Sequence, residues 1–352
     1  MSLETASHRI PEGQYLLDIL DQPRAMAATL KCLRISQELR ALGAGLRDGR
    51  LRRIVLTGMG ASFHALHPLF LRLNARGYAA AAAETSELVH SLEKWLTPET
   101  LIIAVSQSGE SAEIVRLLEV NRRRAAILGI TNDGESALSR GADSSIITLA
   151  GKEFSVSCKT YVTALMALYL VGEFICGSDE RQTVEELSQV VPAAASYLGN
   201  WKEHVFEIAG ALAGVRDLFL LGRGASLAAT GAGALITKES VRLHAEGMSG
   251  AAFRHGPLEM IDDKTFAVVF AGAESTRALQ ARLADDIRQG GGRIGWIAED
   301  TSSRAWSLPR TPANLRAVVE IMPVQMMTLA LAAEKGIEAG RFGRVSKITA
   351  TE

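Results

Sequence analysis

Short aliphatic runs alternate with segments of helical periodicity through the first half of the chain. The runs that predict strands are residues 54–56, 79–83, 101–105, 125–130 and 145–149. Between them, apolar residues recur three or four positions apart, as they do on one face of a helix. Parallel strands are joined by crossover helices and are buried on both faces, so this rhythm predicts a parallel sheet covered by helices on both sides.

The second half repeats this organisation after a mostly helical stretch at residues 161–212. The strand-like runs resume at residues 218–221, 266–270, 294–297 and 318–321. The sequence IVLTGMGAS at residues 54–62 parallels LFLLGRGAS at residues 218–226, which places a G-x-G-A-S signature in each half. A duplication that produced two α/β domains is the simplest account of this repeat.

The segment SQSGES at residues 106–111 joins an apolar run to a helical pattern that begins at Ala112. A helix N-terminus leaves its first backbone N–H groups unpaired and carries a positive partial charge. Serine hydroxyls and a small glycine at this point therefore favour the binding of a phosphate group. The alternative is an ordinary serine-rich loop, because serine is common at helix caps and turns. The second half reads AGAES after Phe270, so the phosphate site is expected in the first half alone.

Two other kinds of phosphate loop are disfavoured. The string G-x-x-x-x-G-K-[ST] does not occur in the sequence. Phe63 and Leu227 stand where a dinucleotide-binding fingerprint requires its third glycine. A single phosphate, rather than the pyrophosphate of a nicotinamide cofactor, fits a serine-rich loop that lacks those glycines, and no cofactor is expected.

Composition and charge narrow the function further. The chain has 352 residues, 47% of them hydrophobic, and a net charge of −1, which allows two cores and gives no general attraction to nucleic acid or membranes. Three scattered cysteines and the lack of a His/Asp/Glu cluster at metal spacing argue against a disulfide framework or a metal site. The longest apolar stretch, residues 162–177, is too short to span a bilayer, and the N-terminus lacks an apolar signal core. These features predict a cytoplasmic protein.

The combination of motifs resembles the double sugar-isomerase (SIS) phosphosugar proteins. It comprises the tandem layout, GMGAS, SQSGES, the segment TKESVRLHAEGMSGAAFRHGPLEMID and the terminal SKITATE. The chain is similar to the isomerase half of glucosamine-6-phosphate synthase and to deglycases of phosphorylated fructose-amino acids, from about residue 30 onward. The resemblance implies two flavodoxin-like αβα sandwiches, generally in a dimer. The expected parts are a first SIS domain at 30–172, a second at 200–341 and a tail over the site at 342–352.

The resemblance also implies roles for individual residues. Those that match the family's phosphate-binding loop are Ser62, Ser106, Gln107, Ser108 and Ser111. Glu239 matches the glutamate that moves a proton between C1 and C2 of the open-chain sugar. His255 matches the histidine associated with ring opening, which typically reaches the partner's pocket, so a homodimer with a shared active site is implied. Lys347 matches the lysine that the synthase tail carries over the sugar.

Two departures from the synthase pattern affect the expected reaction. Ala232 and Ile236 stand where that pattern requires a glutamate and a lysine. The deglycases also have an apolar residue there and keep the glutamate and histidine, although the tail lysine resembles the synthase. The family segment E-x-S-V-A-x-T-K aligns with residues 153–160 only with a one-residue gap, which leaves Ser157 as the one candidate from it.

The chemistry of Glu239 and His255 is consistent with these roles. Aldose–ketose interconversion and the loss of an amine from a ketosamine both require a base beside a carbonyl or imine, and a carboxylate shielded from water can supply it. A histidine titrates near neutrality and suits proton exchange with a ring oxygen. The alternatives are a surface Glu239 paired with Lys238 or Arg242, a His255 that only forms a turn, and a solvated Lys347 at the chain end.

Three classes of function remain. The favoured class is an enzyme that removes the amine of a phosphosugar, as a deaminase/isomerase or a ketosamine-6-phosphate deglycase. A plain aldose–ketose phosphosugar isomerase and a non-catalytic phosphosugar-binding regulator are the alternatives, because fold does not fix function. A complete glutamine-dependent synthase is not expected, because the sequence begins Met1-Ser2-Leu3 without a glutaminase cysteine.

Overall fold

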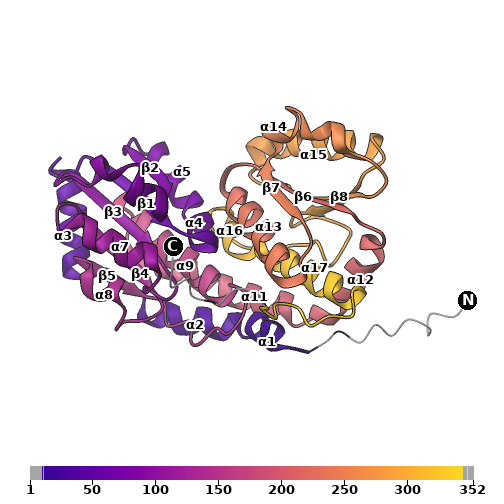
Figure 1. The fold of residues 1–352 in the computed structure, drawn as a ribbon, viewed down its shortest axis with the longest axis horizontal. Helices are drawn as coiled ribbons and strands as arrows, with labels where there is room; N and C mark the ends of the chain where they lie inside the picture. The colour runs from indigo at the N-terminus through magenta and orange to yellow at the C-terminus, as the bar shows by residue number, and fades with distance from the viewer. Residues whose placement is uncertain (1–9, 11, 344–346, 348–352) are drawn as a thin grey trace, which may run out of the picture.

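The computed structural model of the protein describes residues 10, 12–343 and 347. It contains two parallel β-sheets that lie in neighbouring halves of the molecule, indigo to magenta and orange to yellow (Figure 1). Successive side chains along the strands point to opposite faces of each sheet, and each face is covered by its own core cluster. In the first sheet, for example, Leu56 belongs to one cluster and Val55 to the other. The predicted fold class, two tandem αβα units with parallel sheets, is confirmed.

The first sheet has the order β2-β1-β3-β4-β5, with all neighbours parallel. Its strands are β1 (Arg53–Gly58), β2 (Ala80–Glu84), β3 (Thr100–Val105), β4 (Ala126–Thr131) and β5 (Ser144–Ile147). The helices of this half are α3 (Gln37–Arg47), α4 (Gly60–Ala65), α5 (His67–Ala75), α6 (Thr85–His90), η1 (Glu93–Trp95), α7 (Ala112–Asn121), α8 (Ala137–Gly141) and α9 (Lys159–Ile175). This strand order is that of flavodoxin-like doubly wound sheets, in which ligands bind at the carboxyl ends of the strands where the winding reverses.

The second sheet repeats the order with one strand fewer, as β7-β6-β8-β9. Its strands are β6 (Asp217–Gly222), β7 (Ala245–Ser249), β8 (Thr265–Phe270) and β9 (Arg293–Ile297). The helices of this half are η2 (Gly224–Ser226), α13 (Leu227–Val241), α14 (Gly250–Phe253), η3 (Pro257–Met260), α15 (Glu274–Gln289), η4 (Ala313–Leu315), α16 (Arg316–Val319) and α17 (Ile321–Glu334). The remaining helices are α1 (Gln14–Leu20) and α2 (Gln22–Cys32) before the first sheet, and α10 (Glu180–Ser188), α11 (Val190–Leu198) and α12 (Trp201–Leu212) between the sheets.

The structure corrects the sequence prediction at two places in the second half. Residues 318–321 were expected to form a strand but lie in α16 and α17. This segment is a short apolar run that is fully buried, and periodicity alone does not separate such a strand from a core helix. Strand β7 was not expected, because AEGMS carries a glutamate and a glycine and has no β-branched residue.

The two halves share one hydrophobic core. A single cluster of buried residues contains side chains from β1, α9, α13 and α17. The run Ala313–Glu334 is long and apolar enough to span a membrane by length and composition, but 94% of its most apolar window is buried inside the protein. That burial is typical of a core helix.

Helix α13 packs directly on α4 and joins the two halves at their centre (Figure 1). Gly231 permits this contact, because a Cβ atom at that position would collide with the imidazole ring of His64. Gly60 begins α4 at a φ of +52° and faces Leu235 of α13. The close approach brings the polar end of α13, which carries Glu239, to the carboxyl edge of the first sheet.

Candidate active site

The serine-rich loop lies at the carboxyl end of β3 and opens helix α7. Gly109 has a φ of +65°, and a Cβ atom there would collide with the side chain of Ser136. The hydroxyl of Ser106 accepts a hydrogen bond from the backbone N–H of Gly109 at 3.1 Å, and that of Ser108 accepts one from the N–H two residues on at 3.2 Å. Ser111 is the N-cap of α7, and its hydroxyl makes no capping bond to the described backbone. Hydroxyls and the first N–H groups of α7 are thus available to an anion.

A cavity of about 330 Å³ lies between this loop and the second half. Its wall contains every residue predicted to bind phosphate, namely Ser62, Ser106, Gln107, Ser108 and Ser111. Glu239 of α13 and Lys347 of the C-terminal segment line the same cavity. Polar groups that are dispersed over the sequence therefore converge on one space at the switch point of the first sheet.

Glu239 is a partly buried carboxyl group whose environment favours its protonated form. Burial raises the pKa of Glu239 to about 7, and the negative charge of Glu153 acts in the same direction. The positive charges of Lys347 and Lys238 oppose this rise. A carboxyl group with a pKa near 7 can both accept and return a proton at neutral pH, which is what general acid–base catalysis requires.

Lys347 reaches the cavity as one partner of an ion pair. Its Nζ donates to Glu153 Oε2 at 2.8 Å and to the backbone carbonyl of Ser155 at 2.5 Å. The Glu153 side chain is fully buried, whereas that of Lys347 is 20% exposed. Of the predicted tail, residues 342, 343 and 347 are among those that the structure describes, and the other positions of 342–352 lie outside them.

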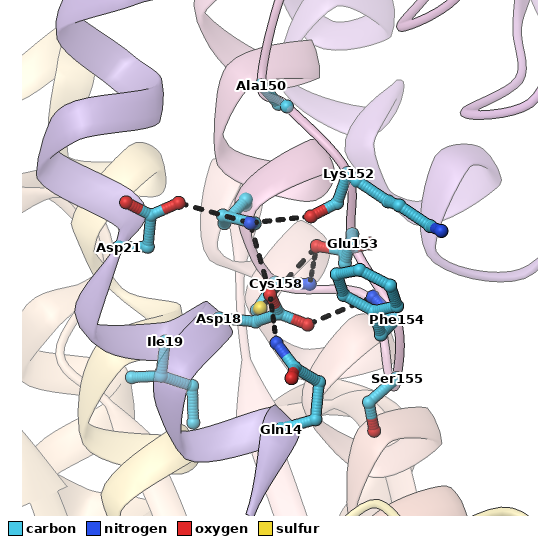
Figure 2. A network of polar contacts seen from close by, with 12 residues as sticks. Gln14, Asp18, Ile19, Asp21, Ala150, Lys152, Glu153, Phe154, Ser155 and Cys158 are labelled. Carbon is cyan, nitrogen blue, oxygen red and sulfur yellow. Dashed lines mark hydrogen bonds and ion pairs between the residues drawn. The ribbon is translucent and has the colours of Figure 1, made fainter.

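The loop that carries Glu153 is fixed by the N-terminal helices α1 and α2, as Figure 2 shows. Asp18 of α1 accepts a hydrogen bond from the backbone N–H of Phe154 at 3.1 Å. The ammonium group of Lys159 lies 3.0 Å from Asp18 and 3.1 Å from Asp21, and it also donates to the carbonyl of Lys152 at 2.8 Å. Charges buried this deeply are tolerated only when they are paired, so the network holds the loop in one conformation.

The sequence profile of the SIS domain matches residues 50–173 and 211–335, one match for each sheet. The chain belongs to the SIS-domain family. The predicted recognition of a double SIS protein is confirmed by this pair of matches. The boundaries expected for the two SIS domains, 30–172 and 200–341, remain a prediction.

Individual relatives of this double SIS protein are enzymes by name. It is 32% identical over 314 residues to a glutamine–fructose-6-phosphate aminotransferase (isomerizing) of Pyrococcus horikoshii, with 85% of this chain and 52% of the relative covered. The C-terminal domain of the glucosamine-fructose-6-phosphate aminotransferase from Francisella tularensis has a TM-score of 0.82 at 22% identity, covering 96% of this chain and 100% of that one. A glucosamine-6-phosphate deaminase from Thermotoga maritima has a TM-score of 0.74 at 16% identity, covering 96% and 100%. The chain spans about half the length of the curated relative.

His255 is the one predicted site residue of this SIS protein that lies apart from the cavity. It follows α14 and is exposed, and it is not in the cavity wall among the residues that the structure describes. Ser157, the candidate from the gapped segment, lines the cavity. The hydroxyl oxygens of Ser157 and Thr160 lie 3.1 Å apart, within hydrogen-bond distance. Ala232 and Ile236 are buried in the shared core.

Two carboxyl groups in the cavity wall were not singled out from the sequence. Glu153 lies in the gapped family segment, and the gap prevented its assignment although the motif begins with a glutamate. Glu113, in the first turn of α7, is buried, and its Oε2 has no hydrogen-bond partner among the described atoms. Within the described part of the chain, no group of three or more His, Cys, Asp or Glu side chains could hold a metal ion.

Replacing Glu239 by glutamine is expected to stabilise the protein at alkaline pH. The folded-state pKa of about 7 lies above the ordinary value of 4.5, so ionisation opposes folding as pH rises from 4.5 to 7 and the penalty is complete above pH 7. Ionisation of Glu239 therefore lowers the free energy of unfolding by about 3 kcal/mol at pH 8 and by under about 1 kcal/mol at pH 5. Urea unfolding of both proteins at the two pH values measures the difference. The exposed Glu246→Gln variant is the control, and an equal effect of Glu239→Gln at both pH values would contradict the prediction.

Proposed function

We propose that the protein is a phosphosugar-processing enzyme whose substrate binds in the cavity between the serine loop and Glu239. The observation that carries the proposal is the convergence of a phosphate-type loop and a carboxyl group with a pKa near 7 on one cavity. A phosphate bound at the start of α7 would direct the sugar chain across the cavity toward α13. Glu239 would then take a proton from the carbon beside a carbonyl or imine and return it to the neighbouring carbon.

The reaction we propose is removal of an amine from the phosphosugar, as a deaminase/isomerase or a ketosamine-6-phosphate deglycase. Ala232 and Ile236 support this choice over amine transfer, because buried apolar side chains take the places of an acid and a base in the synthase pattern. A structural neighbour that is named a glucosamine-6-phosphate deaminase is consistent with it. A plain aldose–ketose isomerase would use the same proton transfer without loss of an amine, and a regulator would bind the sugar without turnover. A cytoplasmic location accompanies the proposal.

The phosphate group is expected to dominate recognition. Ser108→Ala removes one hydroxyl of the loop and should weaken binding of a phosphorylated amino sugar by about 10- to 150-fold, because a hydrogen bond to a charged group contributes about 1.5–3 kcal/mol. Calorimetric titration with the phosphorylated and unphosphorylated sugar measures the effect. Ser139→Ala, in α8 and outside the cavity wall, is the matched control. Equal affinity for the two ligands, or unchanged affinity in Ser108→Ala, would reject the loop as the phosphate site.

Turnover is expected to depend on Glu239. A coupled screen of phosphorylated amino sugars and fructose-amino acid conjugates, scored by release of ammonia or free amino acid, identifies the substrate. Glu239→Gln keeps the shape of the side chain but removes the base, and it should lower the rate on that substrate on the order of 10² to 10⁴-fold while phosphosugar binding persists. Wild-type turnover in the variant would refute the mechanism. Binding of several phosphosugars with turnover of none would favour the regulator.

We further propose a homodimer in which His255 acts in the site of the partner subunit. His255 is exposed and lies outside the cavity of its own chain, so a second copy is the arrangement that lets it reach a sugar. Mixing inactive Glu239→Gln and His255→Asn subunits should then restore part of the activity, because one of the two sites in a mixed dimer carries both intact residues. Light scattering and activity of the mixture provide the test. A strictly monomeric protein would contradict the proposal.

A further inference from the structure

The buried carboxylate of Glu153 accepts hydrogen bonds from two separate parts of the chain. Its Oε1 accepts from the backbone N–H groups of Cys158 and Thr160 at 2.9 and 3.2 Å, and its Oε2 accepts from the hydroxyl of Thr160 at 2.7 Å. These donors belong to the loop before α9 and to the first turn of that helix. The remaining strong donor is the ammonium group of Lys347, which comes from 194 residues further along the chain.

Gly340, which precedes Lys347 in the chain, connects the second half to the loop that carries Glu153. The backbone N–H of Gly340 donates to the carbonyl of Ser240, next to Glu239, at 3.0 Å. The carbonyl of Gly340 accepts from the hydroxyl of Ser155 at 2.5 Å. Gly340 has a φ of +74° and lies so close to Ser155 and Tyr15 that a side chain would not fit. Gly340 is therefore bonded to Ser240 on one side and to Ser155 on the other.

The ion pair determines which charges face Glu239. The titratable groups around that carboxyl are Lys238 on its own helix, Lys347 on the C-terminal segment, Glu153 on the loop before α9, and Tyr15 on α1. Burial raises the pKa of Tyr15, so its phenol is neutral. Lys347 is thus shared between two carboxyl groups, and it is bonded to the more deeply buried one. Glu153 keeps this lysine at the cavity wall without letting it neutralise Glu239 directly.

We infer that Glu153 is a positioning residue that holds the Lys347 ammonium group docked at the wall of the proposed active site. The network of Asp18, Asp21 and Lys159 fixes the loop, so Glu153 is held in place as the partner of Lys347. The docking itself does not depend on the proposed function, whereas its catalytic consequence rests on it.

Site-resolved acetylation of the ligand-free protein tests the docking. The protein is treated with limiting N-hydroxysuccinimide acetate, and mass spectrometry measures the labelling rate of Lys347 relative to the exposed Lys264. Glu153→Gln removes the buried counter-charge and should raise that rate severalfold. Glu173→Gln is the matched control, because it removes a buried carboxylate that is paired with Arg72 at 2.7 Å outside the cavity wall, and it should leave the rate unchanged.

The result that overturns the proposal is a Lys347 labelling rate in folded Glu153→Gln equal to that of the wild type. Circular dichroism establishes whether the variant is folded. If it is not, Glu153→Asp replaces it, because the shorter carboxylate keeps the charge in the loop but cannot reach both the loop donors and Lys347. For Glu153→Asp too, a severalfold rise in the Lys347 labelling rate is expected, and a rate equal to that of the wild type overturns the proposal.

A second readout connects the ion pair to catalysis. Lys347→Met removes a positive charge that lowers the pKa of Glu239, so the acid limb of the pH–rate profile should move to higher pH. In the Glu153→Gln background the same substitution should move it much less, because the lysine is no longer held there. An equal shift in both backgrounds overturns the positioning role. Absence of any turnover would refute the proposed function but would leave the labelling result decisive for the docking.

Discussion

The close contact between α4 and α13 is the constraint on which the site depends. The first half supplies serine hydroxyls at the carboxyl edge of its sheet, and the second half supplies the C-terminal end of α13, which carries Glu239. Gly231 lets the two helices approach until His64 occupies the space of a side chain. A larger residue at this position would push the two helices apart. It would thereby move Glu239 away from the serine loop. The site is thus a product of packing between the two halves rather than of either half.

The duplicated signature shows how the halves have divided their tasks. Ser62 of the first G-x-G-A-S turn lines the cavity. Its counterpart Ser226 is buried and donates a hydrogen bond at 2.8 Å to Glu320, a carboxyl group whose pKa burial raises to about 7. The same turn therefore faces a cavity in one copy and binds one oxygen of a buried carboxyl group in the other. In the second half the turn is part of the interior, and α13 is the element that reaches the cavity.

The parts of the fold that could be predicted from the sequence are those in which local pattern and tertiary environment agree. The aliphatic run before residues 106–111 is a strand because it is buried on both faces, and the polar turn after it must lie at the sheet edge. Residues 318–321 could not be assigned in the same way, because complete burial removes the periodicity that distinguishes helix from strand. For the site, Glu239 and the serines stand in ungapped motifs. Glu153 stands in a gapped one, and its importance depends on Lys347, which only the folded chain brings to it.

The charge balance of the cavity explains why its lysine is held by a carboxylate and not left free. Three carboxyl groups, Glu113, Glu153 and Glu239, line a space that is proposed to receive a doubly charged phosphate. The loop supplies hydroxyls and backbone N–H groups, which bind a phosphate through partial charges. A bound dianion therefore adds negative charge near Glu239 and favours its protonated form, while Lys347 acts in the opposite direction. Because Lys347 is paired with Glu153, its positive charge stays at a fixed place in the cavity wall, and the two effects can oppose each other at Glu239.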